Sequence, residues 1–158
     1  MVFTGGPGTD KTHLATAIDV DAIQKHGKRV RFFLLWSWST RSNQEKANGK
    51  AGQIALWLMC VDLVVLDELG YVPFSKAGGA LLFHLVSKLY ERTSVLITNN
   101  LGFAEWTQVF GDAKMTTALL DRLTHHCHIM ETGHQSWWFK QSSTKLKMAT
   151  GPVNPTKT

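Results

Sequence analysis

The chain has 158 residues, of which 44% are hydrophobic, and its 17 basic and 12 acidic residues give a formal net charge of +5. This length and composition predict one α/β domain with a hydrophobic core, and no apolar run is long enough to cross a bilayer, so no membrane partner is expected. The two cysteines, Cys60 and Cys127, form no Cys-x-x-Cys spacing and no signal peptide precedes the first predicted strand, so we expect a reduced, cytoplasmic protein.

The first predicted strand runs into a loop rich in glycine, and a Lys-Thr pair then opens a helix. Residues 5–12 read Gly-Gly-Pro-Gly-Thr-Asp-Lys-Thr, which is close to the phosphate-binding pattern of Gly, four residues, Gly, Lys and Ser or Thr. In that pattern Lys11 would neutralise the β- and γ-phosphates of ATP, and Thr12 would give its hydroxyl to Mg²⁺. By itself, however, the stretch also fits an ordinary strand-to-helix turn. The residues expected at the nucleotide are Gly5, Gly6, Pro7, Gly8, Thr9, Asp10, Lys11, Thr12 and His13.

Asp10 stands where the pattern has its second glycine. A carboxylate there approaches the phosphates, and two like charges about 5 Å apart repel by roughly 3 kcal/mol at an effective dielectric constant near 20. Asp tolerates unusual backbone angles better than most residues, so the loop can still form. We therefore expect weak phosphate binding.

A regular alternation of strands and helices follows the loop. Residues 11–25 are predicted to form an amphipathic helix in which Leu14, Ile18 and Ala22 recur every four positions, and Gly27 closes it. This alternation predicts a parallel sheet. The later elements are expected as a strand over 29–35, helical sequence over 43–58 with a soft break at Gly49 and Gly52, a strand over 61–68, a helix over 80–90, a strand over 94–98, short helices over 105–110 and 116–125, and a strand over 127–130.

The strand predicted over 61–68 is apolar and β-branched, and it ends in two carboxylates, Asp67 and Glu68. Ligands of open α/β sheets bind at such carboxyl ends. Asp67 can enter the Mg²⁺ shell, and Glu68 can position or deprotonate an attacking water. A solvated pair that caps the next turn is the alternative, but the glycine loop and the acidic strand together favour nucleotide chemistry.

Four longer stretches carry a family resemblance: Leu-Asp-Glu-Leu-Gly-Tyr at 66–71, Tyr-Glu-Arg-Thr-Ser at 90–94, Phe-Gly-Asp at 110–112 and Asp-Arg-Leu-Thr-His-His at 121–126. Over residues 2–143 the chain resembles the AAA+ ATPases of the IstB type, transposition helpers related to the DnaC helicase loaders. The resemblance implies a P-loop NTPase fold, a three-layer αβα sandwich with a five-stranded parallel sheet. It also implies ATP hydrolysis with Mg²⁺ in a DNA-bound homo-oligomer that prepares target DNA for a transposase.

The resemblance also implies roles for particular residues. Glu68 would be catalytic, and Thr12 and Asp67 would hold Mg²⁺. Asn100 falls at the sensor position, where a side-chain amide orients the attacking water. Arg122 resembles the arginine finger that reaches the ATP of a neighbouring subunit; a surface arginine paired with Asp121 is the alternative.

The chain departs from the family in two further respects. Trp138 stands in Ser-Trp-Trp-Phe at 136–139, where relatives have a second sensor arginine. Relatives also carry a region before the first strand that is assigned to DNA and transposase contacts, so the chain has the look of a truncated copy. We expect an AAA+ core over 1–141 and a disordered polar tail over 142–158.

Two functions therefore stay open. One is an ATP-dependent helper of DNA transposition that remodels target DNA. The other is a catalytically impaired interaction module, or a non-functional remnant, with weak or no ATP binding. DNA association is expected to be independent of sequence, with candidate contacts at Lys46, Lys50, Lys140 and Lys145.

Overall fold

The computed structural model describes residues 1–37, 40–41, 44–45, 48, 52–70, 75–90, 92–125 and 127–133. The predicted tail over 142–158, Trp138 and the four candidate DNA lysines lie outside these residues. No helix in the described ranges is long and apolar enough to span a bilayer. The elements are β1 (Val2–Thr4), α1 (Lys11–His26), β2 (Val30–Leu34), η1 (Leu35–Ser37), α3 (Gln53–Met59), β3 (Leu63–Leu69), α4 (Lys76–Leu89), β4 (Ser94–Asn99), η2 (Phe103–Glu105), α5 (Trp106–Phe110), α6 (Ala113–His125) and β5 (Ile129–Glu131).

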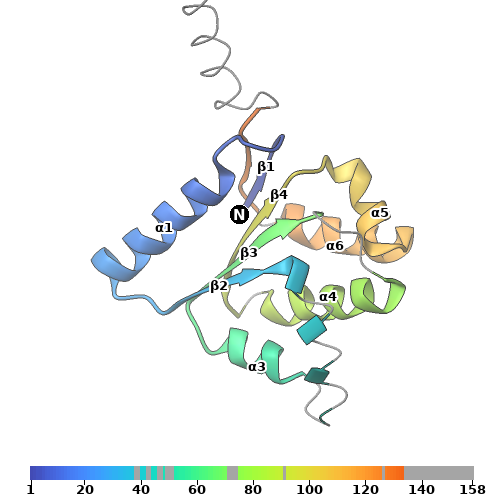
Figure 1. The fold of residues 1–158 in the computed structure, drawn as a ribbon, viewed down its shortest axis with the longest axis horizontal. Coiled ribbons are helices and arrows are strands. Elements are labelled where there is room, and N and C mark those ends of the chain that lie inside the picture. The colour runs from blue at the N-terminus through green and yellow to red at the C-terminus, as the bar shows by residue number, and fades with distance from the viewer. Residues whose placement is uncertain are drawn as a thin grey trace, which may run out of the picture.

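The five strands form one sheet in the order β2-β3-β4-β1-β5, and every neighbouring pair is parallel. This confirms the predicted five-stranded parallel sheet. Figure 1 shows α1 on one side of the sheet and α3, α4, α5 and α6 on the other, which gives three layers. Because all strands run the same way, the loops after β1, β3 and β4 meet at one edge.

The core is divided unequally between the two faces of the sheet. Side chains alternate along each strand, so neighbouring residues of β3 and β4 enter different layers. Val64, Leu66 and Ile97 pack with residues from the helices of the larger layer, and one of these residues is the fully buried Trp106. The other face holds a small cluster in which Ala15 of α1 meets three strand residues, namely Phe3, Val65 and Leu96.

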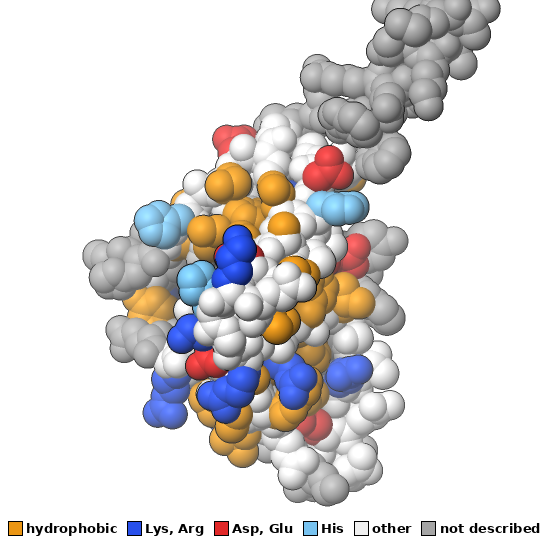
Figure 2. Space-filling model, turned by 90° about the vertical axis from the view of Figure 1, so that its left-hand side faces the viewer, with side chains coloured by type: hydrophobic (Ala, Val, Ile, Leu, Met, Phe, Trp, Pro, Cys, Tyr) orange, Lys and Arg blue, Asp and Glu red, His pale blue; other side chains and the backbone are white. Residues whose placement is uncertain are grey.

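Helix α1 agrees with its predicted bounds, but its buried face is not the predicted one. Leu14 and Ile18 remain 41% and 36% exposed, while Ala15 and Asp19 are the buried positions on the sheet side. The small Ala15 lets the helix lie close to the strands, so the larger residues point outward. Figure 2, which looks onto the α1 side, shows hydrophobic side chains exposed between charged ones. The spacing of four was correct as a helix signal but did not identify the core face.

Several element boundaries differ from prediction for local reasons. Helix α4 begins at Lys76, four residues early, because the Ser75 hydroxyl accepts the Gly78 N–H at 3.1 Å and caps it. By contrast, helix α3 begins after Gly52, at the predicted break, because the φ of 91° at Gly52 stops a helix from extending backwards. Strand β3 continues past the two acids to Leu69 through an irregularity in its pairing with β4.

Asp19 is an unusual residue for a helix face that packs on a sheet. Its side chain is 7% exposed, and its Oδ1 has no hydrogen-bond partner among the described residues. Burial disfavours the charged carboxylate and raises the pKa of Asp19 from 3.8 to about 6. The folded state therefore holds a proton that the unfolded chain has already lost, and the stability this provides disappears as the pH rises from 3.8 through about 6.

We predict that the free energy of unfolding of Asp19→Asn, relative to wild type, increases by about 1–2 kcal/mol between pH 4 and pH 7, after allowing for partial solvent access. Urea denaturation at both pH values measures the difference. Asp21→Asn on the exposed side of the same helix is the control, because Lys25 holds the pKa of Asp21 below its usual range and the relative gain should be absent. Equal pH profiles for wild type and Asp19→Asn would contradict the assignment.

Candidate functional site

The loop between β1 and α1 is held closed by the segment that follows β5. The Gly6 N–H donates to the carbonyl oxygen of Gly133 at 2.9 Å, and the hydroxyls of Thr9 and Thr132 lie 2.7 Å apart. A side chain at Gly5 would meet the same segment, since an added Cβ would lie 2.8 Å from the Gly133 carbonyl oxygen. The first glycine is therefore required by close backbone approach. Thr132 could not be found from the sequence, because a single Thr after a short strand is common.

Lys11 turns its side chain into this loop. Its Nζ donates to the carbonyl oxygens of Gly5 and Gly6 at 2.9 and 2.6 Å, and to the Thr9 hydroxyl at 3.1 Å. The residue is 6% exposed, and burial lowers the pKa of Lys11 while the nearby Asp67 carboxylate opposes that shift. The ammonium therefore lies inside a ring of backbone at the amino end of α1, where an anion would also gain from the helix dipole.

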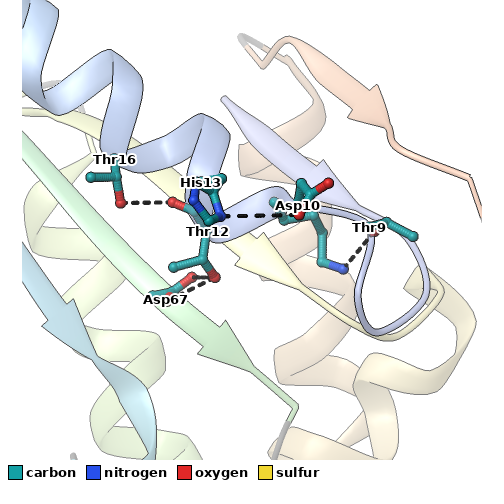
Figure 3. Close-up of polar contacts among 7 residues, drawn as sticks. Thr9, Asp10, Thr12, His13, Thr16 and Asp67 are labelled. Atoms are coloured by element: carbon teal, nitrogen blue, oxygen red, sulfur yellow. Dashed lines mark hydrogen bonds and ion pairs between the residues drawn. The ribbon is translucent and has the colours of Figure 1, made fainter. Parts of the chain in front are cut away.

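Asp10 adopts the left-handed backbone conformation that the pattern reserves for glycine. Its φ is 57° and its ψ 21°, and its side chain makes no capping hydrogen bond at the start of α1. The carboxylate lies toward His13, 4.0 Å from Nδ1, with 43% of the side chain exposed (Figure 3). Asp10 therefore keeps the loop's backbone path, at a conformational cost of about 1 kcal/mol or more.

Thr12 and Asp67, from opposite ends of the predicted site, lie in contact. The Thr12 hydroxyl donates to both carboxylate oxygens of Asp67 at 3.2 Å (Figure 3). Asp67 is 1% exposed and sits on β3, which is separated from β1 by β4. A buried carboxylate beside a hydroxyl is a donor set that suits Mg²⁺, which usually takes one or two protein ligands and completes its shell with water and phosphate. In the described part of the chain no group of three or more His, Cys, Asp or Glu could hold a metal by itself.

Thr98 of β4 connects the two acids and was not predicted. Its hydroxyl donates to Asp67 Oδ1 and accepts the backbone N–H of Glu68 at 3.0 Å. Glu68 has a φ of 63°, so this bond holds a residue that a strand would not normally accommodate. The distortion directs the side chains of consecutive acids differently, and Glu68 is half-buried while Asp67 is buried. A Thr inside a β-strand carries no sequence signal, because Thr is an ordinary strand residue.

The two asparagines after Thr98 differ in their surroundings. Asn99 is fully buried, its Oδ1 accepts the Leu101 N–H at 2.6 Å, and its Nδ2 has no partner among the described residues. Asn99 follows the face of Ile97, away from α1, so its amide supports the turn after β4. Asn100 lies directly past the strand and is half-buried, and its predicted sensor role stays a prediction.

Arg122 is exposed on α6 and rests on α4. Its Nη1 donates to the Ser87 hydroxyl at 2.8 Å, and its guanidinium lies 5.7 Å from the centre of the Phe83 ring. Both contacts come from α4 and neither from the β1–α1 loop. The structure therefore keeps Arg122 accessible from outside, and its predicted role toward a neighbouring subunit stays a prediction.

The chain matches the family model described as IstB-like ATP binding protein over residues 1–145. It is 35% identical over 141 residues to a Pseudomonas aeruginosa protein named for ATP binding and for insertion sequence IS21, covering 89% of this chain and 53% of that one. A Sinorhizobium fredii protein named for ATP binding and for an insertion sequence is 38% identical over 137 residues, covering 87% and 46%. The chain thus spans about half the length of these curated relatives.

Solved structures share the fold at low sequence identity. AMPPCP-bound DnaA from Aquifex aeolicus superposes with a TM-score of 0.70 at 19% identity, covering 98% of this chain and 47% of DnaA. The DnaC helicase loader gives a TM-score of 0.67 at 21% identity, covering 83% and 76%. Together with the sheet order, these matches confirm the predicted AAA+ fold.

We predict that Thr98→Val destabilises the chain by about 1–3 kcal/mol, because the buried Asp67 oxygen and the Glu68 N–H each lose a partner. Thr98→Ser keeps the hydroxyl, loses only a methyl group and should cost about 1 kcal/mol or less. Urea denaturation at pH 7 compares the two. A valine variant as stable as the serine variant would show that the hydroxyl holds neither acid.

Proposed function

Since the chain belongs to the family of IstB-like ATP-binding proteins, we propose that it binds ATP with Mg²⁺ at the β1–α1 loop and acts as a helper of DNA transposition. The observation that carries the proposal is the contact of the Thr12 hydroxyl with the buried Asp67 carboxylate at 3.2 Å, beside a loop that encloses the Lys11 ammonium. Lys11, Thr12 and Asp67 would serve phosphate and metal, and the site is built from three converging strand ends.

Each group at the site has a definite task in this proposal. Lys11 leaves the carbonyl oxygens of Gly5 and Gly6 and neutralises the β- and γ-phosphates. Thr12 and Asp67 would hold Mg²⁺, which would withdraw charge from the phosphate oxygens. Glu68 accepts a proton from the attacking water, and Asn100 orients that water. Thr98 keeps Asp67 and Glu68 in their separate orientations through its two hydrogen bonds.

The impaired module remains the second candidate, and Asp10 favours it. Its carboxylate adds a negative charge near the phosphates and its backbone is held in a conformation better suited to glycine. The exposed position beside His13 weakens the repulsion relative to a buried charge, because solvent screens it. We therefore propose weak binding rather than none.

The wider role rests on the family. We propose that the active form is a homo-oligomer on DNA in the cytoplasm, where it prepares target DNA for a transposase. The exposed position of Arg122 on α6 supports the oligomer, because its guanidinium could reach the nucleotide of a neighbouring subunit.

Removing the charge at position 10 tests the proposal that the Asp10 carboxylate weakens ATP binding. We predict that Asp10→Gly binds a fluorescent ATP analogue with Mg²⁺ at least tenfold more tightly than wild type, since relief of repulsion and of backbone cost exceeds 1.4 kcal/mol. Asp10→Asn is the matched control: it removes the charge and still tolerates the left-handed backbone, so it should recover most of the gain. Unchanged affinity in both variants would refute the electrostatic argument.

Concentration dependence tests the oligomer. In the Asp10→Gly background we predict that ATP turnover per chain rises with protein concentration, and that Arg122→Ala abolishes this rise while leaving ATP binding intact. A trans arginine is worth about 10³–10⁵ in rate in the best-studied systems. Lys114→Ala, at an exposed position of the same helix, should leave the rise unchanged. A rate per chain that is independent of concentration would overturn the role of Arg122.

A further inference from the structure

Four cations gather at the end of the sheet opposite the β1–α1 loop, where β2, β3 and β4 begin. We call Lys28, Arg29, Arg31 and Arg92 the basic pole. Lys28 and Arg92 line one hollow of about 590 Å³, and Arg29 and Arg31 line a second of about 410 Å³. Val61 lines both hollows, so they adjoin one another. Figure 2 looks toward the side where β2 and β3 begin and shows Lys and Arg side chains across its lower half.

The basic pole is only partly neutralised. Among the described residues, Asp62 is the one acid that lines either hollow. It accepts the Arg29 backbone N–H at 2.8 Å and lies 3.4 Å from Arg29 Nε. Hydrogen bonds from Arg29, with the added field of Lys28, hold the pKa of Asp62 below its usual range, so it is ionised at neutral pH. Among the described residues that line the two hollows, four cations and one carboxylate give a net charge of +3. The adjacent Lys25 is paired with Asp21 at 2.6 Å and adds nothing.

An exposed aromatic ring extends the basic pole. Trp57 of α3 is 46% exposed, and the Arg31 guanidinium lies 4.5 Å from its ring centre. This contact holds the Arg31 guanidinium at the exposed surface, where its N–H groups can reach an outside acceptor. Three of the four cations are arginines, whose forked N–H groups match phosphate oxygens.

We propose that the basic pole binds the phosphate backbone of DNA. The proposal rests on the function proposed above only for the class of partner. DNA carries a charge about every 1.7 Å along its axis, so one backbone can meet cations spread over two adjoining hollows. An acidic protein segment is less well matched, because the cations surround no single apolar pocket. Since the parallel strands separate the basic pole from the nucleotide loop, DNA contact here leaves the ATP site free.

The test uses the full chain and fluorescence anisotropy. A 30-base-pair duplex of random sequence and a single strand of the same length are titrated between about 50 and 200 mM salt. The test variant is Lys28→Gln with Arg92→Gln. The matched control is Lys88→Gln with Lys114→Gln, which removes the same charge from exposed positions on α4 and α6.

We expect the test variant to lose more than tenfold in duplex affinity at low salt, and the slope of log K against log salt to fall by about two, one per cation removed. The control variant should stay within about twofold, and affinity for the ATP analogue and thermal unfolding should be unchanged in both. Trp57→Leu should weaken binding of the single strand more than binding of the duplex, because unpaired bases can stack on the exposed Trp57 ring.

Three results would overturn the proposal. Equal losses of DNA affinity in the test and control variants would mean that DNA binds to the overall positive charge and not to the basic pole, while DNA binding itself would stand. No binding of duplex or single strand by wild type would remove both this surface and the DNA part of the proposed function. Polyglutamate that competes as well as DNA at equal charge would identify the basic pole as a surface for acidic proteins.

Discussion

The site depends on one buried carboxylate. Asp67 is almost free of solvent, and a carboxylate in that position is stable only if its oxygens receive hydrogen bonds. Thr12 from the start of α1 and Thr98 from β4 supply them. These two hydroxyls connect α1, β4 and β3, so the loop before α1 cannot move far without leaving the Asp67 carboxylate exposed or without a partner. A divalent cation held by Thr12 and Asp67 would replace the hydrogen bond between them, because the Thr12 hydroxyl oxygen and the Asp67 carboxylate would both become its ligands.

A second constraint closes the loop from its other side. Thr132 and Gly133 hold Thr9 and Gly6, while Lys11 fills the ring with its ammonium. Nucleotide entry in this arrangement requires the Lys11 ammonium to exchange carbonyl oxygens for phosphate oxygens. Lys11 then keeps hydrogen-bond acceptors of a similar kind and loses none. The basic pole lies at the opposite strand ends, which keeps the two surfaces physically separate.

Much of this architecture could be predicted from the sequence, because buried parallel strands have a simple sequence pattern. Apolar β-branched runs alternating with helical stretches predict the sheet, and the rule that strand ends converge predicts that Thr12 and Asp67 are neighbours. Besides Thr132, three features could not be predicted. Thr98 resembles any strand threonine, the left-handed Glu68 has no local signature, and the spacing of Leu14 and Ile18 reports a helix without saying which face is covered. The roles of Asn100 and Arg122 depend on a nucleotide and a neighbour, so they stay predictions.

The most direct measurement is the metal dependence of nucleotide binding. The full chain is titrated with a fluorescent ATP analogue, once with Mg²⁺ and once with EDTA, and the pair is repeated with Asp67→Asn. If Thr12 and Asp67 form the metal position, wild type binds saturably and more tightly with Mg²⁺, and the two curves of Asp67→Asn coincide. Wild-type binding that is equally tight with Mg²⁺ and with EDTA, or no binding at millimolar nucleotide, would contradict the account.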